Sequence, residues 1–244
     1  MKILKFGGKS LANGEGLQKV IQTIAQKYFN NEPIAVVVSA RGNATDELLI
    51  LLKKAQVKIE FKSDFEQFKK YQLEGLKENI FEEEFSTLHK LFEGVSLLGD
   101  YSEKIKDQVI AFGEILSAKY IAHVLNENSI KAQFTDTRQL IKTDDNFGNA
   151  QPIEEISKQN VIAYFRENQD KVNILTGFIG SNLNNETTTL GRNGSNYTAS
   201  LVANYLDAEE FQNYTHVDGI FTANPDLVAD AKKIERLSFN EANE

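Results

Sequence analysis

A lysine, two glycines, a second lysine and a serine follow the first short apolar run of the chain, within residues 5–10. A glycine pair lets a ligand approach bare backbone N–H groups, and lysine supplies positive charge, so this segment is suited to phosphate binding. Its Gly-Lys-Ser is similar to a P-loop, but a P-loop needs another glycine five positions before Gly8. Ile3 occupies that position, so we exclude a P-loop. A phosphate cradle and a plain turn with a solvent-facing Lys5 both remain open.

Two later segments also place glycines at the end of a predicted strand. Residues 176–180 read Thr-Gly-Phe-Ile-Gly, and residues 188–197 bring Arg192 and Gly194 just before a helical pattern. A glycine-rich loop that leads into a helix N-terminus is suited to an anion, and Arg192 can grip a carboxylate or a phosphate. One such turn is a weak signal, but three in one chain favour a phosphorylated ligand.

Polar residues occur at two further positions where chemistry is expected. Ser39 and Thr45 lie between an apolar run and a helical pattern, and Glu114 lies near a helix start. Each fits helix capping as well as catalysis, so both interpretations stay open. The residues alone indicate an α/β enzyme that binds a phosphate and a carboxylate.

The elements that must position these residues alternate between strand and helix. Residues 17–29 have the apolar spacing of a helix, and several further helices are expected between residues 46 and 126. We expect Thr45 to cap a helix, with Asp46 and Glu47 in its first turn. Strands are expected at residues 2–6, 34–40, 130–136, 172–178 and 213–217. Buried strands alternating with helices predict a mainly parallel sheet, whose ligands gather at the C-terminal strand ends.

The composition narrows the class of protein. The chain has 244 residues, 41% hydrophobic and 25% charged, as in ordinary globular domains, and no domain boundary stands out. It lacks cysteine and has three separated histidines, which argues against thiolate and histidine-rich metal sites. Its net charge of −8 argues against a nucleic-acid partner.

The acidic residues 82–84 fit a solvated helical face or an acidic partner-binding tail. No run approaches a membrane span or signal peptide, so we expect a cytoplasmic protein without a membrane partner.

Taken together, these segments resemble the aspartate kinases of the amino-acid-kinase family. The family's opening Lys-Phe-Gly-Gly-Thr-Ser is similar to residues 5–10, and its Thr-Gly-Phe-Ile-Gly and Thr-Thr-Leu-Gly-Arg segments match residues 176–180 and 188–192. Further similar segments are Val38-Ser39-Ala40 with Thr45, Gly113-Glu114 with Ser117, and residues 217–220. Residues 91–99, with Asn193 where many relatives have glycine, are most similar to the kinase half of bifunctional aspartokinase–homoserine dehydrogenases.

The resemblance implies a three-layer αβα sandwich with a mainly parallel central sheet, and an aspartate kinase catalytic domain over residues 1–244. The implied reaction transfers the γ-phosphoryl group of ATP, with Mg²⁺, to the side-chain carboxylate of L-aspartate, the entry to threonine, methionine and lysine synthesis. Relatives continue through a segment with an ATP-contacting lysine, so we expect a domain truncated at its C-terminal end and weakly active or inactive alone. A homo-oligomer with regulatory and homoserine dehydrogenase domains is also implied.

The resemblance assigns roles to individual residues. Lys5 is expected to span the phosphates and to be catalytic with Asn196, whereas Lys9 is not the phosphate lysine. Arg192 is expected to grip the α-carboxylate of aspartate, and Glu114 to meet its ammonium. The implied ATP-binding set is Lys5, Gly7, Gly8, Ser10, Gly194, Ser195, Thr215, His216 and Phe221. The implied substrate-binding set is Ser39, Thr45, Glu114, Phe178, Arg192 and Ser195, and no metal ligand is assigned.

Four positions depart from the family pattern. Lys9 replaces a threonine, Asn196 and His216 each replace an aspartate, and Asp226 stands in place of an arginine. These departures motivate an alternative, a non-catalytic amino-acid-kinase-like module that binds ligand and regulates a partner domain. Asn196 is compatible with turnover, because the nucleophile is a carboxylate with a reference pKa of about 3.9 and needs no general base. We expect Lys9 to replace the positive charge missing at Asp226.

Overall fold

The computed structural model describes residues 1–215, 219, 221–223, 227–228 and 230–236. The chain separates into two units, residues 1–214 and residues 215–244. The second unit contains an antiparallel bridge between Phe221 and Lys233. The first unit contains the helices, strands and candidate site described below.

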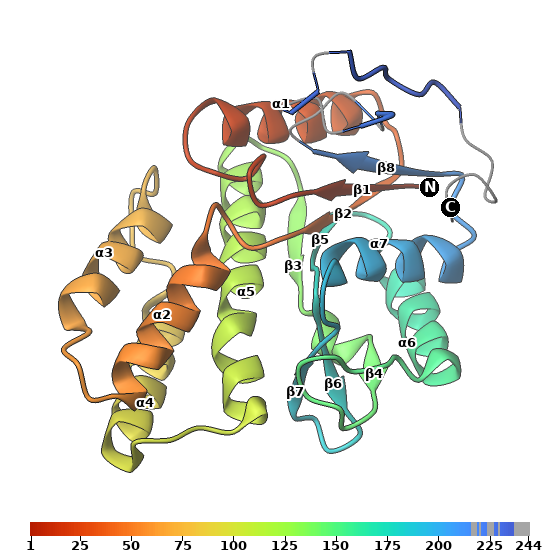
Figure 1. The fold of residues 1–244 in the computed structure, drawn as a ribbon. Helices are drawn as coiled ribbons and strands as arrows, with labels where there is room; N and C mark the ends of the chain where they lie inside the picture. The colour runs from red at the N-terminus through yellow and green to blue at the C-terminus, as the bar shows by residue number, and fades with distance from the viewer. Residues whose placement is uncertain (216–218, 220, 224–226, 229, 237–244) are drawn as a thin grey trace. The chain divides into compact units, whose positions relative to one another are not determined.

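A five-stranded sheet forms the centre of the first unit (Figure 1). Its strands are β1 (Lys2–Phe6), β2 (Ile34–Val38), β3 (Ala132–Thr135), β5 (Val172–Thr176) and β8 (Glu210–Tyr214). Their order is β3-β5-β2-β1-β8, and every neighbouring pair is parallel. The C-terminal ends of all five strands therefore lie along one edge, where loops leave the sheet.

Helices cover both faces of this sheet (Figure 1). They are α1 (Glu15–Phe29), α2 (Ala44–Gln56), α3 (Lys62–Leu73), α4 (Glu82–Leu98), α5 (Glu103–Glu127), α6 (Glu154–Glu167) and α7 (Gly194–Tyr205), with a short 3₁₀ helix at Thr137–Gln139. Leu4 and Phe6 pack in one buried core with α1, α2 and α5, whereas Ile3 packs in a second core with α6 and α7. Because successive strand residues point to opposite faces, β1 contributes to both cores. The expected three-layer αβα sandwich is confirmed.

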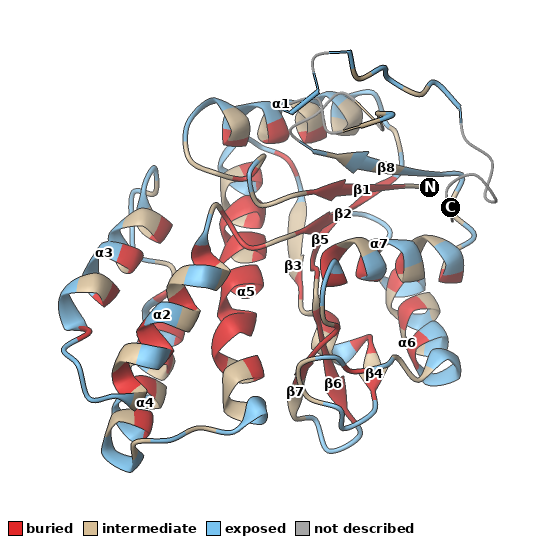
Figure 2. Cartoon of the chain, viewed as in Figure 1, coloured by how far each residue is buried: buried red, intermediate tan, exposed pale blue. Residues whose placement is uncertain are grey.

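The longest helix, α5, is buried along most of its 25 residues. It contacts α2 and α4 on one side and strands β3 and β5 on the other, so the red of buried residues runs along its length in Figure 2. This position explains why the middle of the helix, residues 109–118, is apolar nearly all round. Among the described residues, no helix is both long and apolar enough to cross a membrane.

A second, three-stranded sheet extends from the strand ends. It consists of β4 (Lys142–Thr143), β6 (Ile179–Asn182) and β7 (Thr187–Thr189). β6 pairs in parallel with β4 and antiparallel with β7. The sequence did not predict this sheet, because its strands are two to four residues long and rich in Thr, Ser and Asn.

Most predicted strands are confirmed to within a few residues, but the last one is displaced. We expected a strand at residues 213–217, whereas β8 begins at Glu210 and ends at Tyr214; residues 216 and 217 lie outside the described part of the chain. β8 is an edge strand whose side chains are half-buried or exposed, so it lacks the apolar run of a buried strand.

Thr45 does not cap a helix, contrary to the expectation. α2 begins at Ala44, and Asn43 occupies the N-cap position without a side-chain cap hydrogen bond. Thr45 therefore lies inside the first turn, together with Asp46 and Glu47, which remain favourable for the helix dipole.

The acidic residues 82–84 form the first turn of α4, which supports the helical-face interpretation rather than an acidic tail. Glu84 is buried there and makes an ion pair with Lys119 of α5. Glu84 therefore joins α4 to α5, while Glu82 and Glu83 are exposed, and all three charges favour the start of α4 through the helix dipole.

Candidate active site

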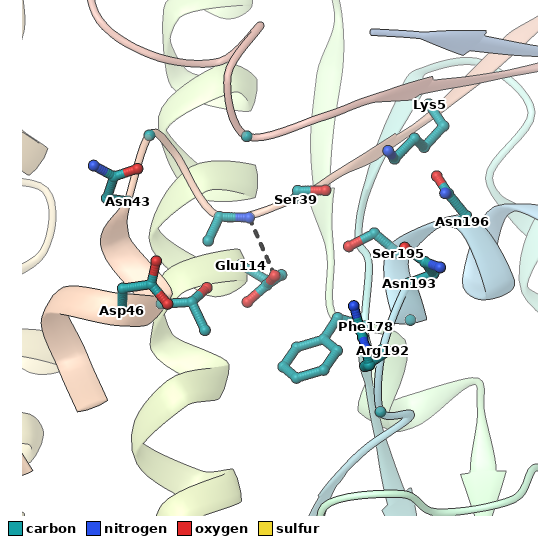
Figure 3. Close-up of a pocket in the computed structure, with 16 residues that line it drawn as sticks. Lys5, Ser39, Asn43, Asp46, Glu114, Phe178, Arg192, Asn193, Ser195 and Asn196 are labelled. Carbon is teal, nitrogen blue, oxygen red and sulfur yellow. Dashed lines mark hydrogen bonds between the residues drawn. The ribbon is translucent and has the colours of Figure 1, made fainter. Parts of the chain in front are cut away.

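One pocket collects most of the residues expected to do chemistry (Figure 3). It lies where β1, β2 and β5, neighbours in the sheet, end, and it has a volume of about 400 Å³. Its lining residues are Lys5, Gly8, Ser39, Ala40, Gly42, Asn43, Thr45, Asp46, Glu114, Phe178, Gly191, Arg192, Asn193, Gly194, Ser195 and Asn196. The three glycine-rich segments, distant in sequence, therefore meet in one cavity.

Lys5 supplies a buried positive charge to this pocket. Alternation along β1 places its side chain on the same face as Ile3, toward α7. The residue is 8% exposed, and burial lowers the pKa of its ammonium. No carboxylate of the described residues lies within ion-pair distance of it. An unpaired buried ammonium is costly, and an anionic ligand would offset that cost.

The first glycine loop approaches the pocket with its backbone. A Cβ added to Gly8 would lie 2.8 Å from the Ala40 carbonyl oxygen, so this position has no room for a side chain. The Gly8 carbonyl accepts a hydrogen bond of 3.0 Å from the Gly42 N–H, which joins the loop after β1 to the loop after β2. Gly7 and Ser10, also expected to bind ATP, do not line the pocket. The Gly7 N–H donates to the Tyr214 carbonyl at 3.3 Å, so it is already engaged.

The start of α7 forms the wall beside Lys5. Asn193, the N-cap residue, has a left-handed backbone with φ of 59°, a conformation that asparagine tolerates better than most residues. A Cβ on Gly194 would lie 2.6 Å from the Phe178 ring, and one on Gly177 would lie 2.6 Å from Ser195 Oγ. These close contacts hold the first turn of α7 against the loop after β5. Within that turn the Gly194 N–H donates to the Gly191 carbonyl at 3.1 Å and the Tyr197 N–H donates to the Asn193 carbonyl at 3.0 Å. The N–H groups of Ser195 and Asn196 have no partner among the described residues and are available to an anion.

Asn196 contributes an unsatisfied acceptor to the same wall. Its Oδ1 is buried and has no hydrogen-bond partner within the described part of the chain. Figure 3 shows Asn196 and Lys5 on the same side of the pocket, with Ser195 between them and the centre. A buried acceptor without a donor is unfavourable, so this site is suited to a ligand or a bound water.

Glu114 lies in the middle of α5, not near a helix start as expected, and supplies the opposite side of the pocket from there. It is 3% exposed, and its Oε1 accepts a 3.1 Å hydrogen bond from the Ala40 N–H, drawn as a dashed line in Figure 3. Its Oε2 is buried without a partner among the described residues. Burial raises the pKa of Glu114 to about 8, although the Ala40 N–H opposes the shift. A cationic group of a ligand would match this carboxyl.

Arg192 completes the polar lining. It is exposed at the pocket mouth, and no ion pair or hydrogen bond of its guanidinium occurs within the described residues. Phe178, at the base of Arg192 in Figure 3, has an unusual positive φ of 67°. Backbone strain of this kind persists where the surrounding structure demands it, often at functional sites. The Thr198 hydroxyl accepts from the Phe178 N–H at 3.0 Å and stabilises the turn.

The sequence analysis missed several lining residues. Asn43 and Asp46 face the pocket, and the Ala40, Gly42 and Gly191 backbones contribute to it. Asp46 was interpreted only as a favourable charge at a helix start. Its position one residue after Thr45, at the same strand-to-helix junction, was the available signal.

Other expected site residues are not placed in this pocket. Thr215 and Phe221 belong to the second unit, and His216 lies outside the described residues. Lys9 is exposed and does not line the pocket. Asp226 also lies outside the described residues, so the charge compensation by Lys9 stays a prediction.

Protein side chains alone do not build a metal cage in the parts of the chain that are described. No group of three or more His, Asp or Glu side chains is placed to hold an ion there. A hard cation such as Mg²⁺ that kept several waters and bound phosphate oxygens would need few protein ligands. The pocket is thus suited to an anion beside Lys5 and α7, facing a zwitterionic group near Arg192 and Glu114.

A parallel αβα sandwich with glycine-rich strand ends and a buried lysine defines an α/β class that binds phosphorylated ligands. Within that class, residues 1–244 match the model of the amino acid kinase family, and the chain belongs to this family.

Curated relatives include lysine-sensitive aspartokinase 3 of Escherichia coli (strain K12), 30% identical over 99% of this chain and 55% of the relative. The bifunctional aspartokinase/homoserine dehydrogenase of Buchnera aphidicola subsp. Acyrthosiphon pisum is 30% identical over 100% of this chain and 32% of the relative. A crystal structure of E. coli aspartokinase III in complex with aspartate and ADP superimposes with a TM-score of 0.86 at 30% identity. It is matched over 96% of this chain and 53% of that one. This chain thus spans about half, or less, of the length of these relatives.

Proposed function

We propose that this chain is the kinase domain of an aspartokinase, which transfers the γ-phosphoryl group of ATP to the side-chain carboxylate of L-aspartate. The observation that carries the proposal is one pocket that brings together Glu114, Arg192, the start of α7 and the Lys5 ammonium, which has no counter-ion among the described residues. One half suits phosphates and the other suits an amino acid. The likeness to a structure described with aspartate and ADP supports the same pair of ligands.

The nucleotide half is proposed to work through charge and backbone. Lys5 spans the phosphates, and Gly8, Gly194 and Ser195 approach them with their main chains. Gly7 and Ser10 do not line the pocket, so they are proposed to support the conformation of the glycine loop. Thr215, His216 and Phe221 are proposed to lie along the nucleoside, on the resemblance alone.

The half of the pocket that suits an amino acid is proposed to bind both charged groups of the substrate. Arg192 grips the α-carboxylate and Glu114 accepts from the ammonium through its free Oε2. Ser39, Thr45 and Ser195 supply hydroxyls around the substrate, and Phe178 packs against its carbon chain. A zwitterion is favoured over a nucleotide as acceptor, because one anionic and one cationic group face it.

The chemistry needs alignment rather than a general base. A carboxylate oxygen of aspartate attacks the γ-phosphorus, the bond from that phosphorus to the bridging oxygen of ADP breaks, and aspartyl 4-phosphate and ADP result. Aspartate is already ionised at neutral pH, so positioning and charge neutralisation carry the catalysis. The Asn196 amide oxygen is proposed to accept a hydrogen bond from the Lys5 ammonium and so to orient that ammonium toward the phosphates. Mg²⁺ is proposed to accompany ATP, held mostly by phosphates and waters, and to neutralise phosphate charge.

The setting of this domain is part of the proposal. We place it in the cytoplasm and in the biosynthesis of threonine and related amino acids, within a homo-oligomer that also carries regulatory and homoserine dehydrogenase domains. The bifunctional name of one relative supports the fusion. Sedimentation of the natural full-length protein would test the oligomer.

A hydroxylamine trap tests the reaction. The protein, MgATP and L-aspartate are expected to yield aspartyl hydroxamate and one ADP per hydroxamate, and replacing aspartate with glutamate should abolish the product. The same assay on a longer natural chain tests whether residues 1–244 are weakly active alone. If calorimetry shows that both ligands bind and no hydroxamate forms in either chain, the protein is the non-catalytic regulatory module instead.

A further inference from the structure

A fully buried arginine lies directly behind the pocket. Arg41, in the loop between β2 and α2, is 0% exposed. Burial lowers the pKa of its guanidinium, because leaving water disfavours the charged form. No ion pair of Arg41 occurs among the described residues, and its Nε has no partner there. A buried charge of this kind is expensive, so its contacts should explain why the chain tolerates it.

The guanidinium of Arg41 joins parts of the chain that are far apart in sequence. Its Nη1 donates to the Gln72 carbonyl at 2.9 Å, and its Nη2 donates to Asn13 Oδ1. Its planar group lies 3.7 Å from the centre of the Tyr120 ring and 5.7 Å from that of Tyr71. A guanidinium group that has left water is attracted to the face of an aromatic ring, which offsets part of the burial cost.

The neighbours of Arg41 are bonded to one another. Asn13 Nδ2 donates to Glu74 Oε2 at 2.6 Å and to the Tyr71 carbonyl at 3.2 Å, and the Tyr120 hydroxyl donates to the Glu74 carbonyl at 3.0 Å. The Asn13 side chain thus bridges the Glu74 carboxylate and the Arg41 guanidinium. The cluster is therefore a connected polar network, in which a change at one member affects the others.

The cluster holds both of the loops that build the pocket. Asn13 lies near the end of the loop that contains Gly8 and connects β1 to α1, and Arg41 lies between Ser39 and Thr45. The two loops are also joined by the hydrogen bond from the Gly42 N–H to the Gly8 carbonyl. Gly42 has φ of 56°, and a Cβ there would lie 2.4 Å from the Tyr71 hydroxyl, so Tyr71 covers this turn closely.

We propose that Arg41 is a positioning residue that fixes the glycine loop and the loop after β2 relative to each other, so that phosphoryl donor and acceptor carboxylate are aligned. This inference rests on the proposed function for the identity of the two ligands. Arg41 does not line the pocket, so it acts through Gly8, Ser39 and Thr45. A loss of alignment should lower the rate of phosphoryl transfer more than it lowers the affinity for either ligand.

Arg41→Met tests the proposal, because it keeps an extended side chain and removes the hydrogen bonds and the charge. We expect kcat to fall by about 100-fold, while KM for ATP and for aspartate changes by less than about threefold. Arg41→Lys keeps a cation over the Tyr120 ring and should recover part of kcat. Asn13→Ala removes one anchor at a partly exposed position and should lower kcat if Arg41→Met does not fold.

Phe165→Leu is the matched control, because Phe165 is buried in the core between the sheet and α6, away from both loops. It should lower the melting temperature without changing kcat. Equal kcat in Arg41→Met, Asn13→Ala and wild type would overturn the proposal, as would a rise in KM alone.

Hydrogen exchange separates this inference from the proposed function. Amides in residues 8–12 and 40–45 should exchange at least about tenfold faster in Arg41→Met and Asn13→Ala, but not in Phe165→Leu. If both loops exchange faster in Arg41→Met and Asn13→Ala and the wild-type chain lacks kinase activity, the positioning role is supported and the proposed function is refuted. Unchanged exchange in both loops would overturn the positioning role whatever the activity.

Discussion

At the scale of single residues, the buried Lys5 ammonium is expected to lower the stability of the fold and to raise the rate of phosphoryl transfer. Lys5→Met removes a buried charge that has no counter-ion in the described part of the chain and keeps the side-chain length. We expect the free energy of unfolding to rise by about 1 kcal/mol and turnover to fall by about 100-fold. Urea unfolding and the hydroxamate assay measure the two effects.

Lys2→Met, on the same strand, is the control for Lys5→Met. Lys2 is partly exposed and pairs with Glu32 at 3.1 Å and Glu210 at 3.5 Å. Its loss should lower stability slightly and leave turnover within about twofold, as for other exposed ion pairs. A Lys5→Met variant that is less stable than wild type and fully active would show that the ammonium is structural.

Glu114 gives a pH-dependent prediction. Burial raises its pKa to about 8, so the ligand-free carboxyl is mostly protonated at neutral pH. The ammonium of aspartate favours the carboxylate, so binding should release a proton. The affinity for aspartate is then expected to rise by about tenfold per pH unit up to about pH 8, and to level off above it. Calorimetry in two buffers of different ionisation enthalpy measures the released proton.

The same shift links Glu114 to stability. Its folded pKa lies above the unfolded value of about 4.3, so the folded chain holds an extra proton between these values. The stability that Glu114 contributes by holding this proton is fully present below the unfolded pKa. It is lost as the pH rises toward about 8. Glu114→Gln should abolish both pH dependences and weaken aspartate binding. An affinity for aspartate that is constant across this range in the wild-type protein would exclude the proposed role.

At the scale of elements, the contact between the loop after β5 and the start of α7 leaves no room for a side chain. A Cβ on Gly177 would lie 2.6 Å from both Cβ and Oγ of Ser195, so Gly177→Ala must displace the first turn of α7. The free energy of unfolding should fall by about 1–3 kcal/mol, and ADP should bind more weakly. Thermal unfolding with and without ADP measures both.

Gly94→Ala is the matched control for Gly177→Ala. Gly94 lies within α4, and no atom lies within 4 Å of an added Cβ. The substitution should stabilise the helix by about 0.5–1 kcal/mol without affecting ADP binding. Equal ADP affinity in the two variants would show that the close packing at Ser195 does not position the nucleotide site.

The elements differed in how far their sequences predicted them. β1, β2 and β5 are buried on both faces, so their apolar runs were sufficient. β8 lies at the sheet edge and the small second sheet is polar, so neither carries the usual periodic signal. The N-cap that we expected at Thr45 lies two residues earlier, at Asn43, because capping residues and first-turn residues have overlapping preferences.

At the scale of the whole first unit, the site exists because β1, β2 and β5 are adjacent and parallel. Their C-terminal ends bring Gly8, Ser39 and Phe178 together, and α5 and α7 close the pocket from opposite faces of the sheet with Glu114 and Arg192 beside it. Residues far apart in sequence thus share one cavity, as expected for parallel α/β sheets.

The sequence by itself determined the α/β class, the glycine-rich strand ends and the residue types of the site, since these depend on local periodicity and local motifs. Only the tertiary structure decided which residues meet. It placed Gly7 in a hydrogen bond with Tyr214, left Lys5 without a counter-ion among the described residues, and buried Arg41 between two tyrosines. The reason is physical: strand pairing and side-chain packing join segments that are distant along the chain, and no local pattern specifies such contacts.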